Sequence, residues 1–532
     1  MHLAIYIAAA LAAIFNLSVE LRRCLMMFQQ NSYRPERYCS WLKTSGDSTT
    51  PKRLIGIFVF FLALASFATG PASALFIGIF SLCSGISLAK KKYKKPLVMT
   101  MRAKRIYYTT LFCAAVLTTG AIILFGKNEL NTSLLTLCDC ILGCYCISHI
   151  LILSADNLLA PIEKRITKRY YDDAARILAS MPDLKVIGVT GSYGKTTTKH
   201  YLHAILSEHF ETLMTPGSYN TTLGVVRTVR EMLKPYHEVF IVEMGAKNIG
   251  DIREICDLVH PQGGIVTAVG PQHLESFKTI ENVQATKFEL VDAVPSSGFA
   301  VINNDFKKIA DRLVSNTTCI RYAVKNIAGA DYIARDIEYS ATGTHFIVER
   351  VADHHIIALS TRLIGECNIS NILAAVAVAH RLGVPDHRIA FAVEKIEQVE
   401  HRLSIKRIPG GLTIIDDAFN SNPVGSAMAL DVLAAMTAGK RYLITPGMIE
   451  LGAEQYDLNH KFGVKAATSC DVAIVVGKYN RDAIVAGLTE GGMAPEKIKT
   501  VDSFTEAQQL LTSTASVGDT VLYENDLPDT FK

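Results

Sequence analysis

Long apolar runs are confined to the first 156 residues of this 532-residue chain, and no other feature limits its fold as strongly. Inside a bilayer no water is present to bond the backbone, so a segment that crosses it forms a helix of about 20 apolar residues. The sequence therefore predicts an α-helical membrane domain over residues 1–156, with about five transmembrane helices. The apolar runs are 3–19, 54–69, 72–89, 106–126 and 134–156.

The number of spans depends on how the short runs are counted. The second and third runs meet at Gly70 and Pro71, which suits a tight hairpin, so four spans are the alternative to five. The first run has neither the basic start nor the small-residue cleavage site of a signal peptide, and we interpret it as a retained span.

Basic residues gather in two of the loops between the runs. The positive-inside rule predicts that these loops face the cytoplasm. With five spans, residue 157 onward is then cytoplasmic, so we expect a multi-pass protein of the cytoplasmic membrane with cytoplasmic catalytic domains. This topology accounts for the lysine run at 90–95 without a lipid head-group partner. The basic residues are Arg22, Arg23, Arg34, Arg37, Lys43, Lys52 and Arg53 in one loop and Lys90, Lys91, Lys92, Lys94, Lys95, Arg102, Lys104 and Arg105 in the other, and the opposite connections contain only Lys127.

Four of the twelve cysteines crowd the last apolar run, with His149 close behind. A metal site there is the alternative to a structural role. The spacing contains no Cys-x-x-Cys pair, and on a helix the four side chains would face several directions. We therefore interpret them as small residues of a membrane helix. The four are Cys138, Cys140, Cys144 and Cys146.

From about residue 184 the pattern changes to short β-branched runs that alternate with amphipathic helical stretches. This alternation predicts a mostly parallel sheet with helices on both faces, in which ligands lie beyond the carboxyl ends of the strands. Later runs at 441–446, 472–477 and 519–523 indicate a second, smaller α/β domain. We find no G-x-G-x-x-G there and expect no dinucleotide.

The first strand of this region leads into Gly191-Ser-Tyr-Gly-Lys-Thr-Thr197 and then into a helix. A glycine turn that opens a helix offers backbone N–H groups and the helix dipole to phosphate. In such a loop Lys195 reaches the β- and γ-phosphates and Thr196 is a Mg²⁺ ligand. Val189 stands where the strict motif has its first glycine, so the loop is a variant, T-G-S-x-G-K-T, and predicts nucleotide binding.

Two further strands end in candidate metal ligands. Glu243 ends an apolar run that starts at Val239, and His273 follows the run 264–269. Each residue alone would more often be a hydrogen-bonded structural residue. Because they follow successive strands beside the nucleotide loop, we expect them to hold Mg²⁺ directly or through water. Asp416 and Asp417 likewise follow an apolar run.

Taken together, these motifs resemble the Mur ligase family, in the family's own order and over roughly residues 184–470. Gly188-Val-Thr-Gly-Ser-Tyr-Gly-Lys-Thr-Thr197 resembles its ATP loop. The D-D-x-x-N-x-N-P run at 416–423 and the G-M-x-E-L-G run at 447–452 favour the branch that adds D-alanyl-D-alanine to UDP-N-acetylmuramoyl-tripeptide. The other matching runs are Asn220–Gly224, Glu243–Gly245, Gly270–Glu275, Ala285–Glu289, Asn303–Asp305, Asn368–Ala375 and His401–Leu403, with His460.

The resemblance implies ATP and Mg²⁺, with two metal ions, and a role for each matching position. Lys287 matches a carbamylated lysine of the family, in which CO₂ turns an ammonium into an anionic metal ligand. The implied catalytic residues are Lys195, Lys287 and His273, and the implied metal ligands are Thr196, Glu243, His273 and Lys287. The implied nucleotide-binding residues are Gly191, Ser192, Gly194, Lys195, Thr196 and Thr197 of the loop, Asn303 and Asn371 near the adenine, and Arg402 and Asp417, which close onto the phosphates and ribose.

The implied reaction is ATP-dependent formation of an amide bond through an acyl phosphate. The expected substrates are a muramoyl-peptide cell-wall precursor and D-alanyl-D-alanine, or another amino acid or dipeptide. The partners are these substrates and the membrane, and the net charge of +4 is too small to predict nucleic-acid binding. The expected domains are a membrane domain (1–156), a linker helix (157–183), a central P-loop domain (184–398) and a C-terminal Rossmann-like domain (399–532).

Three departures from the family pattern leave the acceptor open. The membrane runs stand in place of the family's soluble UDP-binding domain. Cys367 replaces the histidine of a G-x-H-N-x-x-N element, and the run 521–528 replaces a lysine-glycine-serine-arginine element. The alternative function is therefore a related ligase with a lipid-linked acceptor or a non-peptidoglycan acceptor such as a poly-amino-acid.

Two other classes of protein are less consistent with the sequence. A transporter with an ATP-binding domain should carry ionisable residues within its spans, where we find chiefly Asp139 and His149. A scaffold that has lost catalysis should have lost some nucleotide or metal positions, and these are intact.

Overall fold

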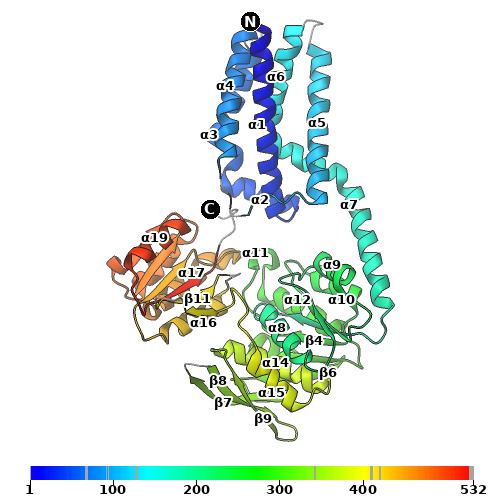
Figure 1. Ribbon diagram of the computed structural model, residues 1–532, viewed down its shortest axis with the longest axis vertical. Helices are drawn as coiled ribbons and strands as arrows, with labels where there is room; N and C mark the ends of the chain where they lie inside the picture. The colour runs from blue at the N-terminus through cyan, green and yellow to red at the C-terminus, as the bar shows by residue number, and fades with distance from the viewer. Residues whose placement is uncertain are drawn as a thin grey trace. The chain divides into compact units, whose positions relative to one another are not determined.

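The computed structural model describes residues 2–65, 70–91, 93, 95–125, 130–340, 343–407, 411–418 and 421–526. Lys92, Lys94, Lys127, Phe419 and Asn420, which belong to predicted loops and motifs, lie outside these residues. Within the described chain, residues up to Thr167 form one unit and Lys168–Asp526 another (Figure 1). A helical N-terminal region is followed by α/β domains, which confirms the predicted fold class.

Small residues allow the helices of the first unit to approach closely. α1 (His2–Gln30) packs along α4 (Gly70–Ala89) and α6 (Leu130–Cys146). A Cβ added to Gly78 would lie 3.1 Å from Ala9 Cα, so glycine lets the α1 and α4 backbones come together, as is common between apolar helices. The other helices of this region are α2 (Pro35–Ser45), α3 (Pro51–Ala65), α5 (Met101–Phe125) and α7 (Ser148–Ala179), with a 3₁₀ turn, η1 (Asp47–Thr49).

Three helices of the described chain, α1, α4 and α5, are long and apolar enough to cross a membrane. α6 and α7 would add a fourth span if the pair, bent by 78°, counts as one. The prediction of about five spans stays a prediction. α3 has 15 described residues, and residues 66–69, at the end of its predicted run, lie outside the described chain. The predicted run 134–156 is interrupted at Ile147, between α6 and α7.

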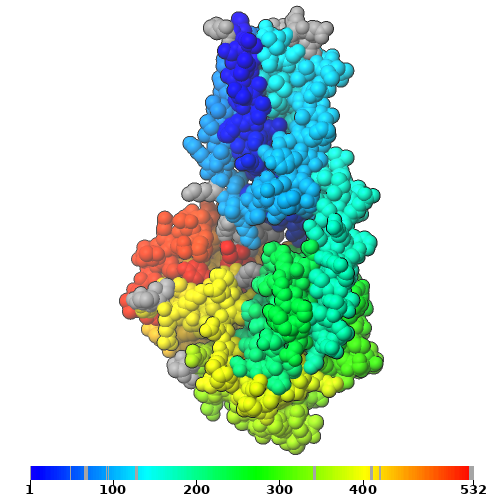
Figure 2. All heavy atoms as spheres, turned by 45° about the vertical axis from the view of Figure 1, so that its right-hand side comes forward, coloured from blue at the N-terminus to red at the C-terminus, as the bar shows by residue number. Residues whose placement is uncertain are grey.

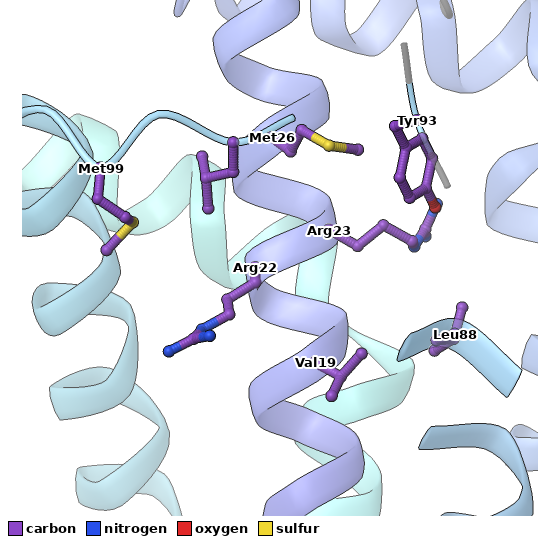
Figure 3. Close-up of a pocket in the computed structure, with 8 residues that line it drawn as sticks. Val19, Arg22, Arg23, Met26, Leu88, Tyr93 and Met99 are labelled. Atoms are coloured by element: carbon purple, nitrogen blue, oxygen red, sulfur yellow. The ribbon is translucent and has the colours of Figure 1, made fainter. Parts of the chain in front are cut away.

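The outer surface of this unit, blue to cyan in Figure 2, carries large exposed apolar side chains. Leu11 on α1, Phe76 on α4 and Phe112 on α5 are each at least 60% exposed. Proteins that stay in water rarely expose so many large apolar residues together. At the end that carries the basic loops, a cavity of about 300 Å³ opens between α1, the end of α4 and residues 93–99 (Figure 3).

The α/β unit contains a nine-stranded sheet in the order β2-β3-β1-β4-β5-β6-β7-β8-β9. Strands β2 to β7 run parallel, as predicted, and β8 and β9 add an antiparallel end that the sequence did not reveal. The strands are β1 (Lys185–Thr190), β2 (Thr212–Met214), β3 (Val239–Glu243), β4 (Gly263–Val266), β5 (Phe299–Asn303), β6 (Thr318–Ala323), β7 (Tyr332–Ser340), β8 (Gly343–Arg350) and β9 (His355–Thr361).

Strand β1 is buried on both faces. Ile187 and Val189 belong to one hydrophobic core, which includes Leu202 and Ile372, whereas Val186 belongs to the other. Alternate side chains of a strand point to opposite faces, so helices cover both sides of this sheet. The helices are α8 (Lys195–Leu206), α9 (Thr222–Met232), α10 (Asp251–Val259), α11 (Leu274–Phe277), α12 (Ile280–Ala293), α13 (Lys307–Ala310), α14 (Glu366–Arg381) and α15 (Asp386–Lys395).

A second sheet, in the order β10-β11-β15-β12-β13-β14, begins after residue 403. All its strands run parallel except β10. The edge strand β14 was not predicted, because its four residues are mostly polar or half-buried. The elements are β10 (Ser404–Arg407), β11 (Thr413–Asp417), α16 (Pro423–Ala434), β12 (Arg441–Thr445), η3 (Gly452–Glu454), α17 (Gln455–Ser469), β13 (Val472–Val476), α18 (Arg481–Glu490), η4 (Pro495–Lys497), β14 (Ile498–Val501), α19 (Phe504–Thr514) and β15 (Thr520–Glu524).

A fully buried acid ends the central strand of this second sheet. The carboxyl group of Glu524 accepts hydrogen bonds from the hydroxyls of Ser421 and Thr445. Burial raises the pKa of Glu524 to about 8. The group is therefore protonated in the folded protein at neutral pH.

Replacing Gly78 by Val should lower the melting temperature of the protein in detergent, by an amount that corresponds to about 1–3 kcal/mol of overpacking. Gly120→Val on α5 is the matched control, because a Cβ there meets nothing within 4 Å. Both changes put a β-branched residue in an apolar helix, so their difference isolates the contact between α1 and α4. Equal melting temperatures for the two variants would contradict this packing.

Replacing Glu524 by Gln should stabilise the protein relative to the parent as the pH rises. The carboxyl takes up a proton on folding, because its pKa is about 8 in the folded chain against an ordinary 4.5. The parent therefore loses stability between these two pH values, by up to about 1.4 kcal/mol per pH unit, and the variant does not. Melting temperatures at pH 5 and pH 8.5 measure this, with the exposed Glu454→Gln as control. A pH-independent difference between variant and parent would contradict the raised pKa.

Candidate active site

The loop between β1 and α8 fits tightly against the segment that follows β4. A Cβ on Gly191, which has a φ of 148°, would lie 2.1 Å from Thr267 Oγ1. Gly194 is left-handed, with a φ of 77°, and precedes the first turn of α8. Ser192 Oγ lies 3.1 Å from both the N and the O of Gly270. Glycines and one hydroxyl thus direct the first N–H groups of α8 into the loop, the arrangement that binds phosphate.

Lys195 folds back over this loop. Its ammonium donates to the carbonyl oxygens of Gly191 at 2.7 Å and Ser192 at 3.3 Å. Burial, together with the charge of Arg402, lowers the pKa of Lys195 to about 8 against the opposing effect of Glu243. Because its two partners are neutral, an anionic phosphate would be a stronger partner for this ammonium.

Glu243, at the end of β3, is buried and surrounded by donors. Its Oε1 accepts hydrogen bonds from Thr196 Oγ1 at 3.1 Å and from Asn220 Nδ2 at 3.0 Å. Lys199 Nζ lies 3.0 Å from Oε2. Burial raises the pKa of Glu243, but the charges of Lys199 and Lys195 outweigh burial and hold it below its ordinary value. The carboxylate is therefore ionised.

The Thr196–Glu243 pair fits a magnesium ion. A hydroxyl and a carboxylate are the hard oxygen donors that Mg²⁺ prefers. Lys199 approaches Oε2 without hydrogen-bonding geometry, so this buried oxygen has no hydrogen bond within the part of the chain that the structure describes. Lys199 was not predicted from the sequence. The signal was its position four residues after Lys195, which places both lysines on one face of α8.

His273 contacts Glu450, which belongs to the G-M-x-E-L-G run but has no role predicted from the sequence. Its Nδ1 pairs with the carboxylate of Glu450, and Lys247 Nζ donates to the same carboxylate at 3.0 Å. Burial lowers the pKa of His273, whereas His273 and Lys247 hold the pKa of Glu450 below its usual range despite burial. A histidine that binds a metal through one ring nitrogen commonly donates the other to a carboxylate. The Glu450 contact is of this kind and leaves Nε2 as the nitrogen for a metal.

Lys287, on α12, is buried without a carboxylate partner. Its Nζ lies 5.8 Å from the centre of the Phe277 ring and makes no ion pair within 4 Å to any described residue. Burial lowers the pKa of Lys287 to about 7, and the charge of Lys195 adds to this effect. A large fraction of this amine is therefore neutral near pH 7.

Two asparagines from different elements lie near the loop. Asn371, on α14, accepts a hydrogen bond from Thr198 Oγ1 at 3.1 Å and packs against Gly194, where a Cβ would lie 2.7 Å from its Oδ1. Asn303, at the end of β5, donates to the carbonyl of Thr267 at 2.9 Å. Asn371 therefore borders the loop directly, whereas Asn303 contacts Thr267, against which Gly191 of the loop packs.

Arg402 and Asp417 bring the second sheet into the electrostatics of the loop. Burial lowers the pKa of Arg402 against the opposing charges of Asp417 and Glu243. Burial also raises the pKa of Asp417 to about 6, although it accepts a hydrogen bond from the backbone N–H of Leu403 at 3.0 Å. Arg402 therefore interacts with carboxylates at the carboxyl ends of both sheets.

Cys367, which stands at the start of α14 in place of a family histidine, is an inert thiol. Burial raises the pKa of Cys367 to about 12, so the sulfur stays protonated and is neither a nucleophile nor a metal ligand at neutral pH.

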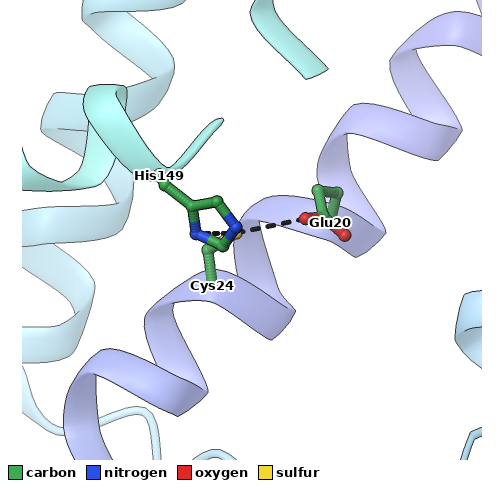
Figure 4. A group of neighbouring side chains, drawn as sticks. All are labelled: Glu20, Cys24 and His149. Atoms are coloured by element: carbon green, nitrogen blue, oxygen red, sulfur yellow. Dashed lines mark hydrogen bonds between the residues drawn. The ribbon is translucent and has the colours of Figure 1, made fainter. Parts of the chain in front are cut away.

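Two other groups of described residues have donor atoms spaced for a metal. In each group the charged side chains already have partners among the described residues. Glu20, Cys24 and His149 meet in the helical unit (Figure 4). Arg23 and Arg53 both pair with Glu20, so no net negative charge draws a cation there. In the α/β unit, Asp386 lies 2.7 Å from His355 Nε2 and 3.1 Å from His380 Nε2. The cysteines of the predicted run 134–156 belong to neither group.

The comparison with known proteins agrees with this geometry. Residues 189–379 match the Mur ligase middle domain, and residues 401–523 match the glutamate ligase domain of Mur ligases. The UDP-N-acetylmuramoyl-tripeptide–D-alanyl-D-alanine ligase of Escherichia coli is 30% identical over 59% of this chain and 69% of the relative. The ligase of the same name from Bacillus subtilis is 27% identical over 71% of this chain and 78% of the relative.

Solved structures give the same result. MurF from Acinetobacter baumannii superposes with a TM-score of 0.60 at 26% identity, over 67% of this chain and 77% of that one. MurF from Thermotoga maritima, solved in complex with ADP, has the same fold, with a TM-score of 0.60 at 24% identity over 68% and 80% of the two chains. The predicted resemblance is confirmed: the chain belongs to the Mur ligase family and is an ATP-dependent ligase with a helical N-terminal region.

Proposed function

We propose that this ligase joins the carboxylate of a muramoyl-peptide cell-wall precursor to the amine of D-alanyl-D-alanine, or of another amino acid or dipeptide. The observation that carries the proposal is the group formed by Lys195, Thr196 and Glu243 around the loop, in a chain similar to relatives that carry this name. A lysine, a hydroxyl and a buried carboxylate at the start of a helix are the components of phosphoryl transfer.

In the proposed reaction, a carboxylate oxygen of the acceptor attacks the γ-phosphorus of ATP, and ADP leaves. Lys195 turns from its loop carbonyls to the phosphates and, with the first N–H groups of α8, stabilises the charge that develops on them. The amine of the second substrate then attacks the acyl phosphate, an amide bond forms and inorganic phosphate leaves. Arg402 and Asp417 act from the second sheet on the phosphates and ribose, and Asn303 and Asn371 border the adenine.

Four residues are proposed as the ligands of two Mg²⁺ ions. Thr196 and Glu243 would hold one ion, and His273, oriented by Glu450, would hold the other. Lys287 would complete the second site as a carbamate, which forms when its neutral, buried amine adds to CO₂ and releases a proton. When bound, Mg²⁺ supplies positive charge beside the transferring phosphoryl group.

We also propose that the helical unit is embedded in the cytoplasmic membrane, with the ligase domains in the cytoplasm. The exposed apolar residues of α1, α4 and α5 and the basic loops support this location. The proposed boundaries are those expected from the sequence, with a membrane domain to residue 156, a linker to 183, and the central and C-terminal domains dividing near 398.

A second candidate substrate follows from the same unit. The matched family domains begin at residue 189, and the described part of the chain before β1 is helical, where the resemblance leads us to expect a soluble UDP-binding domain. A lipid-linked muramoyl peptide, presented at the membrane, is therefore the alternative to a UDP-linked acceptor.

Release of ADP by the full-length protein in detergent should distinguish these acceptors. With ATP and Mg²⁺, we expect release to require an acceptor and an amine together, and Lys195→Ala to lower the rate by about a hundredfold or more. Lys185→Ala is the matched control, because Lys185 is an exposed lysine at the start of β1.

Three results separate the candidates. A requirement for both UDP-muramoyl-tripeptide and D-alanyl-D-alanine would support the first, and release only with a lipid-linked muramoyl peptide would support the second. No release with any muramoyl acceptor would contradict the proposed substrate class, although not the membership of the family.

Removal of CO₂ should inactivate the enzyme reversibly if Lys287 acts as a carbamate. In bicarbonate-free buffer we expect the rate to fall at least about tenfold, as for loss of a metal-site group, and to recover when bicarbonate is added. Lys287→Ala should be slow under both conditions, and Lys278→Ala, an exposed lysine, should respond like the parent. A parent enzyme that stays fully active without CO₂ would contradict the carbamate.

A further inference from the structure

The cavity at the basic end of the helical unit has a mixed lining (Figure 3). Five of its eight lining residues are apolar, two are arginines and one is a tyrosine, and none carries a carboxylate. A cavity with this composition fits a ligand that has an anionic group attached to an apolar chain. The lining residues are Val19, Arg22, Arg23, Met26, Leu88, Tyr93, Leu97 and Met99.

The two arginines differ in whether a carboxylate neutralises their charge. Arg23 pairs with Glu20 at 2.8 Å and with Asp47 at 2.7 Å, so its charge is already compensated. Arg22 has no carboxylate within 4 Å among the described residues, and its guanidinium lies 6.0 Å from the centre of the Tyr107 ring. The cavity therefore has one uncompensated positive charge, and Arg22 supplies it.

A tyrosine hydroxyl also lines the cavity, on the other side of α1 from Arg22 (Figure 3). The hydroxyl of Tyr93 is buried and has no hydrogen bond of normal geometry within the described residues. In Figure 3 it lies next to the guanidinium of Arg23.

The segment that follows α4 adds positive charge to the cavity wall and no carboxylate. Residues 86–105 contain no aspartate or glutamate, and the described lysines include Lys90, Lys91 and Lys104. A field of one sign concentrates anions near a cleft. Topology alone explains the lysines, but it does not explain a cavity that places an uncompensated arginine beside apolar side chains.

An apolar stripe leads away from the cavity along α1. Leu11, Phe15, Val19, Arg22 and Met26 recur every three or four residues, which places them on one face of the helix. Leu11 and Phe15 are exposed, at 63% and 40%. A chain attached to an anion bound at Arg22 could lie along this stripe.

We propose that the cavity binds the phosphate group of a membrane lipid, with Arg22 as the phosphate ligand and the lipid chain along α1. The proposal rests on the proposed membrane location. It extends the proposed function, because a lipid-linked acceptor would carry a phosphate of this class.

Native mass spectrometry of the full-length protein, stripped of lipid in neutral detergent, tests this site. The probes are phosphatidylglycerol and a polyprenyl monophosphate, with phosphatidylcholine as the zwitterionic control. We expect one molecule of either anionic lipid to bind the parent. Arg22→Gln should weaken that binding about tenfold, as for loss of a charged hydrogen bond. The matched control is Lys104→Gln, an exposed cation outside the cavity, which should bind like the parent. Arg22→Lys keeps the charge and should retain most of the binding.

Several outcomes would overturn the proposal. Equal weakening by Arg22→Gln and Lys104→Gln would assign the binding to the general field. Equal binding of all lipids would remove the role of the phosphate, and full displacement by millimolar inorganic phosphate would assign the cavity to a free anion. Carbonate extraction and the ADP assay separate this test from the proposed function. Release of the protein from membranes by carbonate would defeat the membrane location itself, whereas Arg22→Gln should leave ADP release with soluble substrates unchanged.

Discussion

The buried carboxylate of Glu243 is the charge around which the nucleotide site is arranged. It is kept ionised by Lys199 and by the nearby charge of Lys195. Burial of a carboxylate without such partners would cost several kcal/mol, so α8 must pack against the end of β3 with both lysines turned toward it. The loop geometry, the hydroxyl of Thr196 and the position of Asn220 follow from that packing. The Lys199–Glu243 ion pair, which allows the acid to be buried, therefore also builds the site.

Much of the α/β unit could be predicted because its signals are local. A β-branched run, a glycine turn and a helix start identify the loop at 191–197, and parallel strands bring Glu243 to the edge where the loop lies. Lys199 has only a weak signal, its position four residues after Lys195, because a lysine on a helix is usually solvated. The partner of His273 was also hidden. It comes from a motif 177 residues away, and Glu450 reaches it from a left-handed backbone with a φ of 63°.

The helical unit shows what hydropathy does not measure. The hydropathy of a run gives its composition, whereas a span also needs an uninterrupted helix, and the bend between α6 and α7 interrupts the last predicted run. Glu20, inside α1, was overlooked as an ionisable residue of a candidate span. Its neutralising partner Arg53 comes from a different helix, and only the folded structure brings the two together.

The contact between Glu450 and His273 couples the two sheets thermodynamically. Glu450 precedes the 3₁₀ turn η3 on the side of the second sheet, and its carboxylate pairs with an imidazole and an ammonium on the side of the first. Any event that makes His273 a stronger or weaker ligand must change the free energy of that contact. Linkage is reciprocal, so the conformation of the second sheet and occupancy at His273 would each bias the other, as in an allosteric pair.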